Sequence, residues 1–253
     1  MAASLELPAR ERGRSIIFPM PIDTSTIKAI SFDCYGTLID WETGIGAALE
    51  PIFRVHRVAY DRGAALAAFA RHEREVEAGK YQSYGAVLGE VMKRIASEFD
   101  LQLGPGESTA LAASVGLWPA FAETPKCLKA LQRHYKLAIV SNVDDDLFAE
   151  TAPRLGAQVS VVVTAQQVKS YKPGEAHFKE LLSRLAMTPR DVLHVAESRF
   201  HDVAPASAMG FRTVWVNRHA KDGAPSASGA SGATPDLEVQ SLSELCDQMG
   251  VWG

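Results

Sequence analysis

The residues around Asp33 have the types and the spacing of a nucleophilic site. Asp33 ends the apolar run 28–33 and opens the segment Asp33-Cys34-Tyr35-Gly36-Thr37-Leu38. Such a run predicts a buried strand that holds the carboxylate rigidly at its end, while Gly36 allows a turn and Thr37 offers a hydroxyl. Carboxylates act as covalent nucleophiles when neighbouring donors orient one oxygen toward the reacting centre. An isolated acid at a strand end is more often a turn or helix-capping residue, so both interpretations stay open for Asp33 alone.

Three further groups of polar residues follow this segment along the chain. Ser141 and Asn142 come after another apolar run, and a hydroxyl and an amide at a strand end can hold an anion. Lys172, which precedes a proline, can supply fixed positive charge. Glu197 and Asp202 bracket a strand end and a helix start. Each group alone has a simpler interpretation, as a turn, a solvated charge or a helix cap, but the four groups together favour a catalytic site.

Short apolar runs rich in β-branched residues predict the strands that position these groups. They alternate with stretches of helical periodicity, which indicates a parallel sheet covered on both faces by helices. Ligands in such sheets bind beyond the carboxyl ends of the strands, where the polar groups stand. We therefore predict an α/β fold with a Rossmann-like, doubly wound parallel sheet. The predicted strands are 28–33, 137–140, 159–164, 192–195 and 213–216, and the predicted helices around them are 124–135, 145–155, 175–186 and 202–209.

The segment between the first strand and Thr124 predicts an all-helical insertion. It has no convincing strand, and its apolar residues recur three and four positions apart. Because it directly follows the first strand, it is expected to form a cap over the strand ends. The predicted organisation is an N-terminal extension at 1–25, a core at 26–44 and 123–253, and a cap at 45–122 with helices at 45–56, 64–78, 84–99 and 108–115. A surface loop is predicted at 221–235 and a closing helix at 241–249.

The composition indicates which kinds of binding partner and which cellular compartment to expect. The formal net charge of −4 and the isoelectric point near 6.0 argue against nucleic acid, whose binding proteins usually carry a basic face. No apolar run is long enough to cross a membrane, so no membrane partner is expected. The cysteines, Cys34, Cys127 and Cys246, lack metal-binding spacing and form a poor disulfide framework, which favours a cytoplasmic location.

The four polar groups together resemble the four sequence motifs of the haloacid dehalogenase superfamily, over roughly residues 26–250. The segment Phe32-Asp33-Cys34-Tyr35-Gly36-Thr37-Leu38 is similar to the first motif of the branch that contains the L-2-haloacid dehalogenases. This resemblance implies that Asp33 attacks the carbon bearing the halogen of a small carboxylic acid and forms an ester. Water then attacks the Asp33 carbonyl and releases a 2-hydroxy acid, with no cofactor. The resemblance also implies a homodimer.

The resemblance implies roles for further residues around the nucleophile. A cap arginine assists the departing halide in that branch, and Arg71 matches its position, with a solvated helix arginine as the alternative interpretation. Tyr35 stands where superfamily phosphatases carry the acid that protonates a leaving alcohol, and a halide needs no such proton. Tyr35 and Trp41 are expected to contact the substrate. The residues expected to hold the nucleophile, the substrate carboxylate or the attacking water are Thr37, Ser141, Asn142, Lys172 and Asp202.

Three positions depart from the well-studied haloacid dehalogenases. Glu197 and Arg199 replace a serine and an asparagine, and Phe178 replaces a tyrosine. Superfamily phosphatases use a carboxylate at the position of Glu197 to bind magnesium, so Asp33 and Glu197 would form part of a Mg²⁺ site. The alternative function is therefore a magnesium-dependent phosphatase of small phosphomonoesters. Tyr35 argues against it, since a phosphatase without its general acid loses about 10²–10⁴-fold in rate.

A third alternative is a catalytically silent binding protein that keeps the fold as a scaffold. Loss of any member of the catalytic set would favour this alternative. The set is intact in the sequence and consists of Asp33, Thr37, Ser141 and Lys172. We therefore expect an enzyme.

Two histidines close to the last motif are expected to be structural. His194 lies within an apolar strand, where a core histidine with satisfied hydrogen bonds is the favoured interpretation. His201 stands beside Asp202, but adjacent residues on a helix point apart, so a direct role for His201 is the less favoured interpretation.

Overall fold

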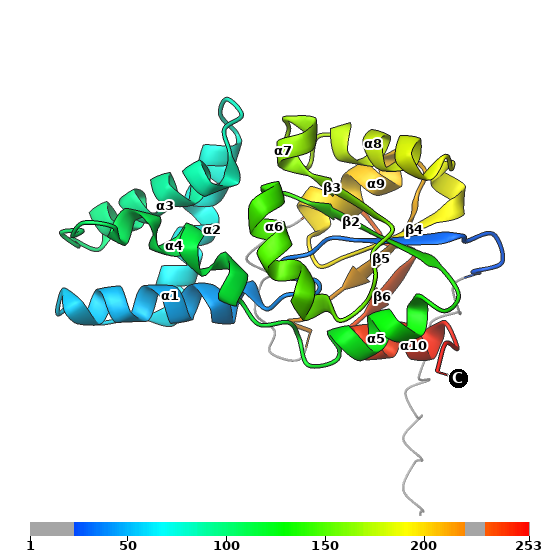
Figure 1. Ribbon diagram of the computed structural model, residues 1–253, viewed down its shortest axis with the longest axis horizontal. Coiled ribbons are helices and arrows are strands. Elements are labelled where there is room, and N and C mark those ends of the chain that lie inside the picture. The colour runs from blue at the N-terminus through cyan, green and yellow to red at the C-terminus, as the bar shows by residue number, and fades with distance from the viewer. Residues whose placement is uncertain (1–22, 221–230, 253) are drawn as a thin grey trace, which may run out of the picture.

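The computed structural model describes residues 23–220 and 231–252, which form a six-stranded parallel sheet with helices around it (Figure 1). The order of the strands is β3-β2-β1-β4-β5-β6, and all neighbouring strands pair in parallel. The predicted α/β fold with a doubly wound parallel sheet is confirmed. The strands are β1 (Ala29–Phe32), β2 (Lys136–Ser141), β3 (Val161–Thr164), β4 (Val192–Ala196), β5 (Arg212–Val216) and β6 (Leu237–Val239).

Helices cover both faces of the sheet, so its strands are buried on both sides. This explains why their sequences are continuous apolar runs. They are α5 (Thr124–Leu131), α6 (Asp145–Thr151), α7 (Ala165–Val168), α8 (Ala176–Leu185), α9 (Ala204–Ala208) and α10 (Leu242–Gln248). In Figure 1, α5 and α10 lie on one side of the sheet, and α8 and α9 lie on the other. Side chains of β1 alternate between these layers. Ile30 and Phe32 share an apolar cluster with Leu128 of α5. Ala29 packs instead with Phe178 of α8.

Between β1 and β2 the chain forms a separate group of helices beside the sheet (Figure 1). These helices, called the helical insertion below, are α1 (Trp41–Val55), α2 (Arg62–Glu77), α3 (Tyr84–Glu98) and α4 (Ala110–Ser114). Asp40, Asp61 and Ser83 each precede a helix and accept a hydrogen bond from a backbone amide of its first turn, so they act as N-caps. Fully buried apolar side chains such as Phe53 and Leu88 join the helices.

Local capping and irregular turns move several boundaries from their predicted positions. The first helix of the insertion begins at Trp41 rather than at residue 45, because Asp40 caps it. The predicted helix 108–115 is broken, since α4 has five residues and a 3₁₀ turn on each side. The predicted helix 202–209 is partly replaced by a π-helical turn at Arg199–Val203, which continues into α9.

Some predictions concern segments that are short or lie outside the described residues. β6 is absent from the sequence-based prediction, because a three-residue strand gives too short a pattern to distinguish from a loop. The predicted N-terminal extension at 1–25 and the predicted surface loop at 221–235 lie mostly outside the described residues. Within 23–220 and 231–252, no helix has the length and apolar character needed to cross a membrane.

Candidate active site

The carboxyl ends of three adjacent strands bring the predicted polar groups together. Asp33 directly follows β1, Ser141 ends β2 and Glu197 directly follows β4. Because β1 pairs with β2 on one side and with β4 on the other, these residues meet at one edge of the sheet. The order of the strands reverses between β1 and β4, and ligands of doubly wound sheets bind in the crevice at such a point.

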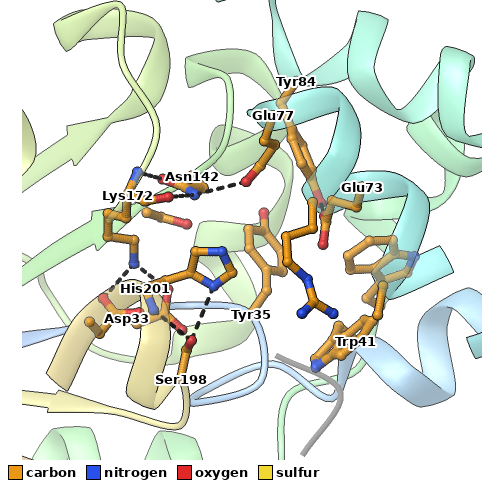
Figure 2. A pocket seen from close by; sticks show the side chains of 15 residues that line it. Asp33, Tyr35, Trp41, Glu73, Glu77, Tyr84, Asn142, Lys172, Ser198 and His201 are labelled. Atoms are coloured by element: carbon orange, nitrogen blue, oxygen red, sulfur yellow. Dashed lines mark hydrogen bonds and ion pairs between the residues drawn. The ribbon is translucent and has the colours of Figure 1, made fainter. Parts of the chain in front are cut away.

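Lys172 is the centre of a buried network of charges. Its ammonium group donates hydrogen bonds to Oδ1 of Asp33 at 2.8 Å, to Oδ1 of Asp202 at 2.6 Å and to the carbonyl of Val140 at 3.0 Å. These bonds use all three N–H groups of the ammonium. The Lys172 side chain is 2% exposed, so it supplies a fixed positive charge beside Asp33 (Figure 2).

The second oxygen of the Asp33 carboxylate is held by Thr37. The Thr37 hydroxyl donates to Oδ2 of Asp33 at 2.8 Å and accepts a hydrogen bond from the backbone N–H of Glu197 at 2.9 Å. Gly36 lets the chain turn so that the Thr37 hydroxyl reaches Asp33, because its φ of 93° lies in a region that other residues rarely adopt. Both oxygens of Asp33 are therefore oriented by donors from the core.

Asn142 holds the backbone that carries Lys172. Its Oδ1 accepts a hydrogen bond from the backbone N–H of Lys172 at 2.7 Å, and its Nδ2 donates to the Lys172 carbonyl at 3.2 Å. The same Nδ2 lies 3.3 Å from Oε2 of Glu77 in the helical insertion. Ser141 is different, because its buried hydroxyl lines the cavity and has no hydrogen-bond partner within the described residues.

Burial and charge act in opposite directions on the ionisable groups of this network. Burial raises the pKa of Asp33 against the effect of the Lys172 ammonium, and the Asp202 carboxylate adds to the increase. Burial also disfavours ionised Asp202, but the Lys172 ammonium and a hydrogen bond from His194 hold the pKa of Asp202 at about 2. Burial opposes the charge of Lys172 too, yet the carboxylates of Asp202 and Asp33 raise its pKa above the ordinary value.

A cavity lies between this network and the helical insertion. It contains about 680 Å³ of empty space, part of which is open solvent. Figure 2 shows Glu73, Glu77 and Tyr84 of the insertion across the cavity from Asp33 and Lys172. Its lining residues are Asp33, Tyr35, Ser141, Asn142, Lys172, Ser198, His201 and Asp202 from the core, and Trp41, Ala70, Glu73, Arg74, Glu77, Tyr84 and Trp118 from the insertion and its connections.

Two predicted catalytic residues do not line this cavity: Thr37, which contacts Asp33 from behind, and Arg71, which points elsewhere. Arg71 lies on α2 with 48% of its side chain exposed, and it pairs with Glu98 of α3. The structure therefore does not bring the predicted residue Arg71 to the cavity, because it lies on another face of the helix. The face of α2 that lines the cavity consists of Ala70, Glu73, Arg74 and Glu77, with the three- and four-residue spacing of one helical face.

Arg74 is the arginine that lines the cavity. Its side chain makes no hydrogen bond or ion pair with the residues at 23–220 and 231–252, in contrast to Arg71. A guanidinium without a hydrogen-bond partner among the described residues can bind an anion in the cavity. The sequence alone did not distinguish the two arginines, because both stand in the same charged stretch of one helix.

His201 also lines the cavity, contrary to expectation. It belongs to the π-helical turn Arg199–Val203, whose wider winding places His201 and Asp202 on the same side. The Ser198 hydroxyl lies 3.1 Å from Nδ1 of His201. Burial lowers the pKa of His201 to about 4, so its imidazole is neutral at physiological pH.

Two carboxyl groups of α2 enter the cavity, which the sequence analysis did not predict. The Tyr84 hydroxyl donates to Oε1 of Glu73, and burial raises the pKa of Glu73 to about 7. Burial raises the pKa of Glu77 well above its ordinary value, and the neighbouring Glu73 carboxylate adds to this. The signal was the four-residue spacing of Glu73 and Glu77, which is also typical of a solvated helix face.

The contacts of Asp33 and the position of Glu197 bear on the magnesium site of the phosphatase alternative. Mg²⁺ requires an octahedral set of oxygen ligands. The Asp33 oxygens are held by Lys172 and Thr37, so an ammonium already supplies the cation there. Oε2 of Glu197 lies 3.5 Å from the place that a Cβ on Gly36 would take, beside the turn that follows Asp33. In the described part of the chain, no three His, Cys, Asp or Glu side chains form a metal-binding group.

Known proteins share this fold and sequence pattern. The model of a family of haloacid dehalogenase-like hydrolases matches residues 27–210. An (S)-2-haloacid dehalogenase of Pseudomonas sp. (strain YL) is 25% identical over 226 residues, which cover 85% of this chain and 91% of that protein. The structure of an L-2-haloacid dehalogenase from Xanthobacter autotrophicus is similar, with a TM-score of 0.77, 21% identity and coverage of 90% of this chain and 100% of that chain. A ribulose-1,5-bisphosphate 5-phosphatase of Halopiger xanaduensis is 26% identical over 155 residues, which cover 56% of this chain and 65% of that protein.

Replacing Lys172 by alanine will leave Asp33 and Asp202 buried without their shared cation. We expect the free energy of unfolding near neutral pH to fall by about 3–5 kcal/mol, the cost of leaving a buried charge uncompensated. The loss should shrink as the pH falls toward about 4, because carboxylates without the cation have raised pKa values and become protonated. Urea unfolding at several pH values measures both effects.

Lys179→Ala is the matched control for this experiment. Lys179 lies on α8 with 68% of its side chain exposed and pairs with Glu175 at 2.8 Å, so its loss should cost less than about 1 kcal/mol at every pH. An equally small loss in Lys172→Ala would contradict the assigned electrostatics, as would a large loss that does not vary with pH.

Proposed function

Because this chain belongs to the haloacid dehalogenase-like hydrolase family, we propose that it hydrolyses small (S)-2-haloacids to 2-hydroxy acids through a covalent ester at Asp33. The similarity to an (S)-2-haloacid dehalogenase supports this substrate class. The contacts of Lys172 and Thr37 support a nucleophilic role for Asp33, since each orients one carboxylate oxygen. The choice of a halide as the leaving group rests on the contacts of Tyr35.

Tyr35 directs its proton away from the cavity. Its hydroxyl lies 2.9 Å from Oγ1 of Thr151. Because the Thr151 hydroxyl donates to the Leu147 carbonyl at 3.2 Å, Tyr35 is the donor in their shared bond. Burial also raises the pKa of Tyr35 well above its ordinary value. A halide leaves as a stable anion, whereas the alkoxide that leaves a phosphomonoester needs a proton, so these contacts favour dehalogenation.

In the first step, one oxygen of Asp33 attacks carbon 2 of the acid from the side opposite the halogen. A C–O bond forms while the carbon–halogen bond breaks, and its electron pair leaves with the halide. The configuration at this carbon inverts. Arg74 takes the role predicted for Arg71, because its guanidinium lines the cavity and can bind the departing anion.

In the second step, water attacks the carbonyl carbon of the Asp33 ester. Asp202 accepts the proton, since its Oδ2 is buried at the cavity and has no hydrogen-bond partner within the described residues. The alkoxide of the 2-hydroxy acid leaves and takes up this proton. The second proton of the water is released from the Asp33 carboxyl to solvent, which regenerates the carboxylate. Ser141 and Asn142 bind the substrate carboxylate, and Asn142 then exchanges its contact with Glu77 for one with the substrate.

A magnesium-dependent phosphatase is the second candidate function. The carboxylate of Glu197 favours it, as does the partial match to a phosphatase. The donor set around Asp33 and the proton of Tyr35 argue against it. The two candidates differ in leaving group and in metal dependence, so one set of assays separates them.

Halide release and phosphate release should be measured in parallel, with L-2-chloropropionate and with a generic phosphomonoester, each with Mg²⁺ and with EDTA. We expect halide release that persists in EDTA and disappears in Asp33→Asn, whose amide keeps the shape of the side chain but is a poor nucleophile. Magnesium-dependent phosphate release without halide release would overturn the proposed function.

Arg74→Ala and Arg71→Ala form a matched pair on one helix. We expect Arg74→Ala to lower kcat/KM for the haloacid by about 10–100-fold, the effect of losing a hydrogen bond to a charged group. Arg71→Ala should leave kcat/KM nearly unchanged, because Arg71 pairs with Glu98 at the surface. Steady-state kinetics of both variants test this, and the reverse ranking would restore Arg71 as the arginine of the site.

Glu73 should set an alkaline limit to activity. With a pKa of about 7, its carboxyl is neutral below that pH and becomes negative above it. An ionised Glu73 repels an anionic substrate, so we expect kcat/KM for the haloacid to fall as the pH rises above about 7. In Glu73→Gln this decline should be absent. A decline that persists unchanged in Glu73→Gln would assign the titration to another group.

A further inference from the structure

His194 lies directly behind the candidate catalytic residues, in the centre of the sheet. It is on β4, opposite Ser31 of β1 in the register of the two strands. Both side chains are fully buried. The ring of His194 packs edge-on against Phe178, with 5.1 Å between ring centroids and an interplanar angle of 88°. The position and tilt of the imidazole are therefore fixed from two sides.

Both nitrogens of His194 have partners, and these partners define which nitrogen of a neutral ring carries the hydrogen. Nε2 lies 3.0 Å from Oδ1 of Asp202, and Nδ1 lies 2.9 Å from the Ser31 hydroxyl. An ionised carboxylate has no hydrogen to donate, so Nε2 carries the proton of the first bond. In the neutral imidazole, Nδ1 is then an acceptor, and the Ser31 hydroxyl donates to it. Ser31 thereby selects the tautomer that binds Asp202.

The two oxygens of Asp202 have different surroundings as a result. Oδ1 accepts hydrogen bonds from Lys172 at 2.6 Å and from His194 at 3.0 Å. Oδ2 is buried and lacks a hydrogen-bond partner within the described residues, although Asp202 lines the cavity. Two donors on one oxygen fix the rotation of the carboxylate and leave the other, buried oxygen without a partner among the described residues. Lys172 alone would not fix this rotation, because its ammonium also binds Asp33.

We infer that His194 is a positioning residue for the hydrolytic step, which holds Oδ1 of Asp202 so that Oδ2 meets the attacking water. This inference rests on the proposed function. As the water oxygen bonds to the ester carbonyl carbon of Asp33, one of its protons passes to Oδ2 of Asp202. When the ester C–O bond breaks, that proton passes to the departing oxygen of the 2-hydroxy acid, and the other proton of the water leaves the Asp33 carboxyl for solvent. His194 itself keeps its proton throughout and does not touch the substrate.

The two chemical steps respond differently to loss of His194. His194→Phe keeps a planar ring against Phe178 but removes the donor to Asp202, so ester formation should proceed while ester hydrolysis slows by about 10–100-fold. The covalent ester at Asp33 should then accumulate, which mass spectrometry of acid-quenched enzyme detects. His194→Gln retains an N–H donor and should recover part of the hydrolysis rate. Ser31→Ala removes only the choice of tautomer and should have a smaller effect in the same direction.

A spectroscopic measurement tests the same contact without any substrate. Heteronuclear NMR of the imidazole nitrogens should show His194 as the neutral Nε2–H tautomer, and Ser31→Ala should mix the tautomers. Observation of the Nδ1–H tautomer in the unmodified protein would overturn the inferred role. Because this readout does not depend on turnover, it stays informative if the proposed function fails.

The kinetic outcomes distinguish the two levels of failure. If the unmodified protein releases no halide from any 2-haloacid, the proposed function fails. If it does release halide but His194→Phe hydrolyses its ester at the unmodified rate, the positioning role fails. Equal slowing of both steps in His194→Phe, without rescue by His194→Gln, would also overturn the inference, because it indicates general damage to the site. His194→Gln and Ser31→Ala keep the test available if His194→Phe does not fold.

Discussion

The ammonium of Lys172 holds two carboxylates that would otherwise repel each other in a buried place. Burying three ionised groups costs several kcal/mol each in lost hydration, and their attraction offsets this only if the remaining hydrogen bonds are also made. Here Thr37 satisfies Asp33, and His194 satisfies Asp202. Lys172 comes from the segment between α7 and α8, and its partners come from the ends of β1 and β2 and from the turn after β4, with His194 of β4 behind them. The geometry of the site therefore follows from the sheet as a whole.

Strand register is the constraint that places these partners. Ser31 stands opposite His194, and Phe32 stands opposite Val195, so the chain leaves β1 and β4 at the same level of the sheet. A shift of one residue would send His194 to the opposite face, because side chains alternate along a strand. The hydrogen bond to Asp202 would then be lost together with the apolar contact to Phe178. Packing and catalytic geometry are thus specified by the same register.

The sequence predicted the parts of the site that depend on strand ends. Asp33 and Ser141 could be placed because a polar residue at the end of an apolar strand has few possible positions. Lys172 lies between α7 and α8, away from any strand end, and was placed because the motifs resemble a known superfamily. The helical insertion was predictable as helices, but the faces of α2 were not. Its charged residues follow a helical period on every side, so only packing against the core decides that Arg74 enters the cavity while Arg71 meets Glu98.

The turn after β4 shows a second limit of prediction. His201 was expected to point away from Asp202, since α-helical winding was assumed for this segment. The π-helical turn has no signature that the sequence analysis could use, and it depends on contacts such as the bond between Ser198 and the backbone N–H of His201 at 3.0 Å. β6 was missed for a related reason, because three residues carry too little pattern.

The charged residues that the core and the insertion contribute to the cavity have different roles. Asp33, Asp202 and Lys172 belong to the core, and the proposed ester chemistry uses them whatever the leaving group, so they say little about the substrate. The face of α2 adds the cation Arg74 and the two acids Glu73 and Glu77. With both acids neutral, the cavity wall on this side carries a net positive charge and suits an anion, and with both ionised it does not. Because burial beside the core raises the pKa of both acids, the packing of the insertion against the sheet influences the charge of this cavity wall.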